Sequence, residues 1–116
     1  DGVIAMPLIG TLDAMRTQEV MERLLSGIVQ QRVHTAILDL TGVRAIDAPV
    51  ADGLLGIARA AKLLGARVIL TGIGPEIAQT LVHLQTDLGG ILIKGNLQAG
   101  IAHALRATGT DRGGAR

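Results

Sequence analysis

Three aspartates lie close together in the sequence, and any two of them could in principle form a pair of catalytic carboxylates: Asp39, Asp47 and Asp52. Two carboxyl groups in different environments can perform general acid–base catalysis. However, Asp47 precedes a helical pattern and is expected to be its N-cap, and Asp52 comes about one turn later, where it should face solvent. Ser26, the only serine, falls in the middle of a helical pattern and not on a sharp nucleophile elbow. We therefore predict no catalytic residue and no enzymatic activity.

A glycine-containing turn, Thr71–Pro75, lies between a predicted strand and a predicted helix. Backbone N–H groups at such a helix N-terminus can bind phosphate. The turn lacks the third glycine of a dinucleotide-binding fingerprint and the lysine of a P-loop, and Asp39, which could hold magnesium, has no P-loop partner. We therefore expect a structural turn and retain one alternative, the binding of a nucleotide or another small ligand at the helix N-termini.

The three histidines, His34, His83 and His103, are scattered along the chain, and there is no cysteine. No two of these histidines have the spacing of metal ligands, so we predict no metal site and no cofactor. The absence of cysteine also excludes disulfides and thiol chemistry, which fits a reducing compartment.

Four threonines lie in or beside the most informative part of the chain. Thr41 follows a predicted buried strand, where its hydroxyl is expected to bond its own turn, and Thr71 ends the next strand. Thr80 falls inside a predicted helix, and the simplest interpretation of its hydroxyl is a bond to the carbonyl one turn back. Thr86 comes after that helix.

The composition indicates one domain with a modest core. The chain has 116 residues, 48% of them hydrophobic, and no Phe, Tyr or Trp, which favours layered α/β packing. The formal charge of +1 comes from interspersed signs, so we expect no nucleic-acid partner and no anionic membrane partner. No apolar run reaches the length of a membrane span, and the first residues have no basic region, so we expect no signal peptide. The sequence does not begin with Met, so we expect it to be a fragment or a processed chain that lacks upstream sequence.

Strand and helix patterns alternate along the whole chain, which predicts an α/β domain over residues 1–107 with a mixed sheet and helices mainly on one face. Residues 108–116 are small and polar, and we expect them to be disordered. The strands are expected at Val3–Ile9, Thr35–Leu40, Arg67–Thr71 and Ile91–Ile93, and the helices at about residues 13–31, 47–65, 74–84 and 96–106.

Several segments together resemble the STAS domain, specifically the RsbR type found in bacterial stressosomes and related to anti-sigma factor antagonists. They are Met6–Asp13, Leu38–Val43, Asp47 with Val50 and Ala51, and Gly72–Val82. The resemblance implies a non-enzymatic scaffold or antagonist domain in the bacterial cytoplasm. Its partners would be a switch serine/threonine kinase and other STAS proteins, within a homo-oligomer or a larger assembly.

The resemblance also implies two phosphoacceptor positions. One directly follows the aspartate that opens the second helix, and in this chain it is Ala48, which has no hydroxyl. The other lies in the third helix and matches Thr80, so Thr80 is the phosphoacceptor candidate. Two further positions depart from the family pattern, since Gly74 replaces a common Arg and Ala14 replaces a frequent Thr.

The expected partner surface centres on the start of the second helix, with the start of the third helix beside it. Open α/β sheets present their binding groups where strand ends lead into helices. Because Ala48 cannot accept a phosphate, we expect a constitutive binder that phosphorylation at this position cannot release. The predicted partner-binding residues are Asp47, Val50, Ala51, Asp52, Pro75 and Glu76.

Overall fold

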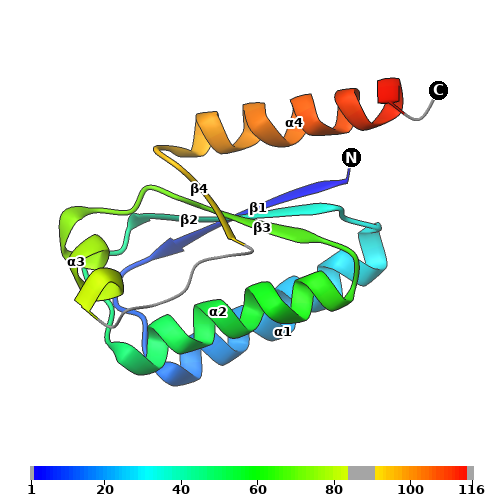
Figure 1. The fold of residues 1–116 in the computed structure, drawn as a ribbon. Coiled ribbons are helices and arrows are strands. Elements are labelled where there is room, and N and C mark those ends of the chain that lie inside the picture. The colour runs from blue at the N-terminus through cyan, green and yellow to red at the C-terminus, as the bar shows by residue number, and fades with distance from the viewer. Residues whose placement is uncertain (1, 84–90, 115–116) are drawn as a thin grey trace.

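The computed structural model describes residues 2–83 and 91–114, with side chains up to Arg106. Strands and helices alternate along this part of the chain (Figure 1). The elements are β1 (Val3–Ile9), α1 (Ala14–Gln31), β2 (Thr35–Gly42), α2 (Ala48–Leu63), β3 (Arg67–Thr71), α3 (Pro75–His83), β4 (Ile91–Lys94) and α4 (Leu97–Gly114).

The four described strands form one sheet in the order β1-β2-β3-β4, and each neighbouring pair is parallel. The register places Met6 beside Leu38, Leu38 beside Leu70 and Leu70 beside Ile93. The α/β prediction is confirmed, but the expected mixed sheet is wrong for these strands. An apolar run such as β4 predicts a strand without indicating its direction, because either direction can bury both faces.

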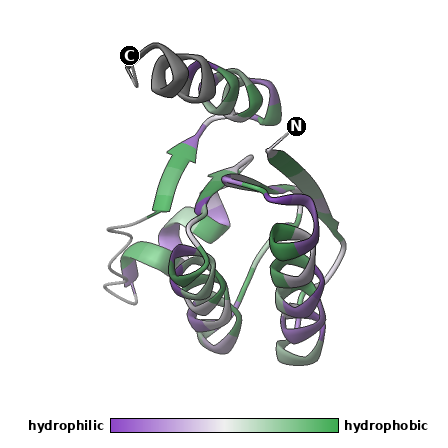
Figure 2. Cartoon of the chain, turned by 90° about the vertical axis from the view of Figure 1, so that its right-hand side faces the viewer, coloured by the Kyte–Doolittle hydropathy of each residue, from purple (hydrophilic) through white to green (hydrophobic). Residues whose placement is uncertain are grey.

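Most of the helical packing is on one face of the sheet, as predicted. Figure 2 shows α1 and α2 side by side on one side of the sheet and α4 on the other. The larger core cluster joins the sheet to α1, α2 and α3, for example through Leu24, Ile57 and Ile77, which are fully buried. A smaller cluster between the sheet and α4 contains Ile37 and Ile69.

Residue types explain where the first two helices begin. The Asp13 carboxylate accepts a hydrogen bond from the Arg16 N–H at 2.8 Å, and Asp47 accepts one from Val50 N–H at 3.0 Å. The predicted N-cap Asp47 is therefore confirmed, and Asp13 caps α1 in the same way. Pro49 occupies the first turn of α2, where its missing N–H costs nothing.

The buried face of α1 is narrower than its apolar residues alone would indicate, because the side chains of Met15 and Val29 are 76% and 63% exposed. The backbone of α4 remains helical through Gly114, over residues for which the sequence favoured a disordered tail, while residues 115 and 116 lie outside the described part. The extent of the domain, residues 1–107, stays a prediction.

Candidate interaction site at the helix N-termini

The predicted partner surface lies at the end of the sheet where β2 and β3 finish. Because the strands are parallel, the loops that follow them emerge at the same edge, beside α3 in Figure 1. One loop leads into α2 and the other into α3. The fold therefore brings together two segments that are separated in the sequence by the whole of α2 and β3.

The start of α2 presents a short exposed segment above a buried one. Asp47, Ala48 and Pro49 are exposed, whereas Val50 and Ala51 are only 0% and 1% exposed and belong to the core. Val50 and Ala51 are therefore closed to solvent in this chain and hold the helix start in place from beneath. The predicted partner surface can here be formed only by the exposed residues, and it stays a prediction.

The start of α3 lies beside it. Pro75 and Glu76 are exposed, and the Arg44 Nε from the preceding loop donates a hydrogen bond to the Glu76 carboxylate at 3.0 Å. The two side chains are 89% and 52% exposed, so this ion pair contributes at most about 1 kcal/mol to stability. Its role in the surface is geometric, since it links the loop before α2 to the first turn of α3.

Thr80 lies in the middle of α3 and is half-buried. Its hydroxyl donates a hydrogen bond to the Glu76 carbonyl at 3.0 Å, as expected for a threonine inside a helix. Phosphorylation of Thr80 would require the hydroxyl to leave this bond. Its assignment as a phosphoacceptor stays a prediction, and Thr86, the other threonine near this helix, lies outside the described residues.

A buried carboxylate joins the ends of the two central strands. One oxygen of Asp39, which is 8% exposed, accepts a 2.6 Å hydrogen bond from the Thr71 hydroxyl and a 3.0 Å bond from the Thr41 hydroxyl. Gly72, with φ of +71°, packs so closely against Thr41 and Asp39 that a Cβ there would overlap the Thr41 hydroxyl. This cluster, Asp39 with Thr41, Thr71 and Gly72, fixes where both loops begin.

Only one of the two hydrogen bonds in this cluster could be predicted from the sequence. Thr41 bonds within its own strand end, as predicted, but the bond between Thr71 and Asp39 joins residues 32 positions apart. The sequence did contain one sign of this contact, namely an aspartate near the end of an otherwise apolar strand. A buried carboxylate needs a hydrogen-bond partner, and the neighbouring strand can supply one.

We expect Thr71→Val to destabilise the chain by about 1–2 kcal/mol, because the buried Asp39 carboxylate loses its shorter hydrogen bond while side-chain volume is kept. Thr41→Val should cost less, since Thr41 is exposed and water can replace its hydroxyl. Urea unfolding of the two variants measures the difference. An equal or larger loss for Thr41→Val would contradict this ranking.

A shallow groove runs between the two loops. Its lining residues are Thr41, Gly42, Val43, Arg44, Gly72, Gly74, Pro75 and Glu76. This is the place that the alternative prediction assigned to a nucleotide or small ligand. Arg44 could attract a phosphate, but Glu76 is paired with Arg44 and places a negative charge in the same groove.

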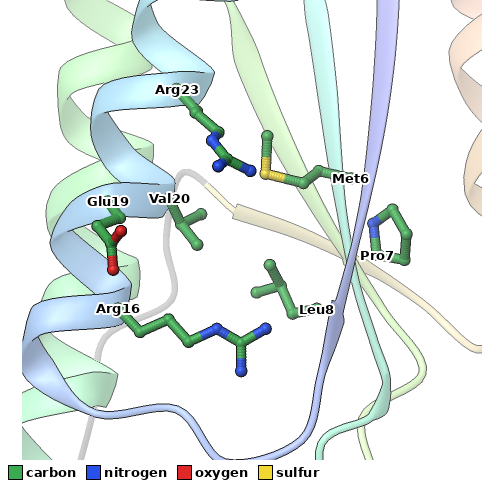
Figure 3. A pocket seen from close by; sticks show the side chains of 7 residues that line it. All are labelled: Met6, Pro7, Leu8, Arg16, Glu19, Val20 and Arg23. Atoms are coloured by element: carbon green, nitrogen blue, oxygen red, sulfur yellow. The ribbon is translucent and has the colours of Figure 1, made fainter.

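A separate hollow lies between β1 and α1 (Figure 3). Met6, Leu8 and Val20 line its apolar part, together with Pro7, Arg16, Glu19 and Arg23. Arg16 Nη1 donates hydrogen bonds to the carbonyls of Ile9, at 2.6 Å, and Thr11, at 3.1 Å. Arg16 therefore holds the turn between β1 and α1, and Glu19 is the one carboxylate beside the two arginines that line this hollow.

The remaining predictions about chemistry concern absences. Over residues 2–83 and 91–106, His, Asp and Glu side chains do not gather in any group of three that could hold a metal ion. Ser26 lies in the interior of α1, as predicted, and is exposed there, and Asp52 faces solvent on α2, also as predicted. Within the described chain, none of the helices is both long and apolar enough to cross a membrane.

Comparison with known proteins places this geometry in a family. The chain is 43% identical over 108 residues to the RsbT co-antagonist protein RsbRA of Bacillus subtilis, a match that covers 93% of this chain and 39% of the relative. It thus spans about two fifths of that protein.

Two solved structures share the fold. An RsbS variant from Moorella thermoacetica has 30% identity and a TM-score of 0.80, covering 93% of this chain and 92% of that one. A structure of the stressosome, described as a signal integration and transduction hub, has 28% identity and a TM-score of 0.71, covering 91% and 90%. The STAS domain model matches residues 1–109. The chain therefore belongs to the STAS domain family and, within it, is similar to the RsbR proteins of the stressosome and anti-sigma factor antagonist group.

Proposed function

We propose that this domain is a non-enzymatic binding module of a stressosome-like, partner-switching complex in the bacterial cytoplasm. It binds a switch serine/threonine kinase and other STAS proteins through the starts of α2 and α3. The observation that carries the proposal is the start of α2, where Asp47 caps the helix and Ala48 is exposed at its first position. A side chain at this point is available to both a kinase and a docking partner.

The relatives support the choice of partner. RsbRA is described as a co-antagonist of RsbT, and one matched structure is a stressosome. A kinase of the RsbT type, from the organism that encodes the chain, is therefore the first partner to test, with a homo-oligomer or a mixed STAS assembly as its setting.

Asp52 offers a direct test of the surface. It is exposed one turn into α2, beyond the buried Val50 and Ala51. We expect Asp52→Arg to weaken binding of the RsbT-type kinase or of a partner STAS protein by about tenfold, because a reversed charge within the interface opposes complementarity. Titration calorimetry measures this, with Glu22→Arg on exposed α1 as the charge-matched control. Unchanged affinity of Asp52→Arg for both partners would move the binding surface elsewhere.

Ala48 gives this domain its distinctive regulation. A phosphate adds about −1.5 to −2 charges and three acceptor oxygens at pH 7, and an alanine can receive neither. The charge of the exposed surface at the start of α2 therefore stays the same whether or not the kinase is active. Switching of this domain must come from Thr80, from a partner STAS protein, or from another part of a longer protein.

Thr80 is the phosphoacceptor that remains. We expect the RsbT-type kinase with labelled ATP to modify the parent chain, and Thr80→Ala to lose that label. Thr41→Ala is the matched control, because Thr41 is a more exposed hydroxyl outside α3. Label that persists in Thr80→Ala, on Thr41 or Thr86, would contradict the assignment.

The second candidate function is binding of a nucleotide or another small ligand in the groove between the two loops. The groove itself and the exposed Arg44 favour it, whereas the Glu76 carboxylate opposes an anionic ligand. Direct titration with GTP and ATP separates the two functions. Affinity in the micromolar range that falls in Arg44→Ala would favour the ligand-binding function.

A further inference from the structure

The last residue of β3, Thr71, makes two different contacts with the two branches of its side chain. Its hydroxyl donates the 2.6 Å hydrogen bond to the Asp39 carboxylate. Its methyl group lies against Gly100 of α4, where an added Cβ would come within 2.7 Å of it. Thr71 is 0% exposed, so neither contact is shared with solvent. This one side chain therefore joins α4 to the carboxylate from which the two loops are held.

The position of Thr71 on the sheet explains the double contact. Side chains two residues apart on a strand share a face, so Thr71 points to the same side of the sheet as Ile69. Asp39, the neighbour of Thr71 on β2, likewise shares the face of Ile37. Ile37 and Ile69 form the smaller core cluster with α4, which covers this face opposite α1 and α2 (Figure 2). The hydrogen-bonded pair of Thr71 and Asp39 thus lies on the side of the sheet that α4 covers.

The absence of a side chain at Gly100 is what lets α4 lie so close to this pair. An added Cβ would be 3.6 Å from methyl groups of Ile37 and Ile69, which is an ordinary contact distance. Only the 2.7 Å approach to the Thr71 methyl group is well inside the about 3.5–4.0 Å at which carbon atoms attract. The methyl and hydroxyl of Thr71 share one Cβ, so rotation that moves the methyl away also moves the hydroxyl off Asp39. A larger residue at position 100 must therefore push α4 outward or break the bond to Asp39.

The bond to Asp39 reaches the loops before α2 and α3. The same Asp39 oxygen accepts the 3.0 Å hydrogen bond from the Thr41 hydroxyl, and Gly72 packs against Thr41 and Asp39. Thr41 and Gly72 line the groove between these two loops. A change in how α4 sits on the sheet can therefore reach the groove through Thr71 and Asp39.

We propose that Gly100 and Thr71 are positioning residues for the partner surface, so that the seating of α4 on the far face of the sheet sets the affinity for a partner at the starts of α2 and α3. Both residues are buried, so neither contacts the partner itself. The inference rests on the proposed function, because it takes these helix starts as the binding surface. It adds α4 as an element that controls this surface from the opposite side of the sheet.

The two branches of Thr71 allow a direct test. Gly100→Ala should shift the amide resonances of Thr41 and Gly72 in the free chain and weaken binding of the RsbT-type kinase by about three- to tenfold. Addition of Thr71→Ser, which removes the methyl group and keeps the hydroxyl, should return both measurements towards those of the parent. A purely destabilising effect of the two substitutions would instead add up and make the double variant worse.

Two glycines elsewhere provide matched controls. Gly95 lies between β4 and α4, and an added Cβ there would meet nothing within 4 Å. At Gly27 on α1, an added Cβ would press on the end of the Ile4 side chain, which belongs to the larger core cluster on the other face. Gly95→Ala and Gly27→Ala should both leave the kinase affinity and the Thr41 and Gly72 resonances close to those of the parent.

Unshifted Thr41 and Gly72 resonances in folded Gly100→Ala would overturn the proposal, as would a double variant that binds no better than Gly100→Ala. If Gly100→Ala alone does not fold, the double variant should fold, and its failure to do so would also count against the proposal. The resonances are measured without a partner. A parent chain that does not bind the kinase would therefore refute the proposed function, while the free-chain resonances still decide whether the seating of α4 reaches the groove.

Discussion

Ala48→Thr should convert this domain into one that phosphorylation can release. The substitution places a hydroxyl at the first position of α2, where the side chain is exposed and Asp47 keeps the helix capped. A phosphate at this helix start gains about 0.5–1 kcal/mol from the helix dipole, so the domain should stay folded. The added charge acts on docking, and we expect the phosphorylated form to bind the RsbT-type kinase at least about tenfold more weakly.

Every variant in this experiment also carries Thr80→Ala. A phosphate can then be added only at position 48 or at an unintended site. Ala45→Thr is the matched control, because Ala45 is also exposed in the loop before α2 but does not start the helix. Mass spectrometry and binding after incubation with kinase and ATP give the result. If Ala48→Thr is phosphorylated and its affinity stays the same, the start of α2 is not the surface that controls binding.

Val50→Asp should unfold the domain or come close to it. Val50 is 0% exposed in the first turn of α2, and an unpaired carboxylate at a buried position costs about 3–5 kcal/mol. That is a large part of the stability of a small domain. Urea unfolding measured by circular dichroism gives the loss.

Asp52→Arg is the control for this comparison, since Asp52 is exposed only two residues later on the same helix. Its stability should remain within about 0.5 kcal/mol of the parent. The two variants thus separate loss of folding from loss of the surface charge. A Val50→Asp protein that unfolds at the parent's urea concentration would show that Val50 is not part of the core.

The sequence patterns predicted what depends on local physics. Asp13 and Asp47 were identifiable as N-caps because a short acidic side chain before an apolar helical pattern has few other roles. The element order was also predictable, since apolar strands and helical stripes alternate clearly. The position where α2 begins could be predicted from the Asp47 cap. The importance of Ala48 could be inferred only from the resemblance, which implies a phosphoacceptor at that position.

What could not be predicted depends on which surfaces meet. Burial of Ala51 at the start of α2 is a tertiary fact, as is the hydrogen bond between Asp39 and Thr71. The docking of α4 was equally hidden, because α4 packs tightly against the sheet at Gly100, where an added Cβ would press on the Thr71 methyl group. A glycine contributes nothing to an apolar stripe, so the pattern gives no sign of this contact.

The central claim is that Ala48 locks the start of α2 in a form that binds its partner. Its most direct test is the affinity of the Thr80→Ala chain for the RsbT-type kinase, measured by titration calorimetry before and after incubation with that kinase and ATP. The account predicts binding in both samples with the same dissociation constant. Binding before incubation that is lost after it would contradict the account, because this chain would then be released without a hydroxyl at either position.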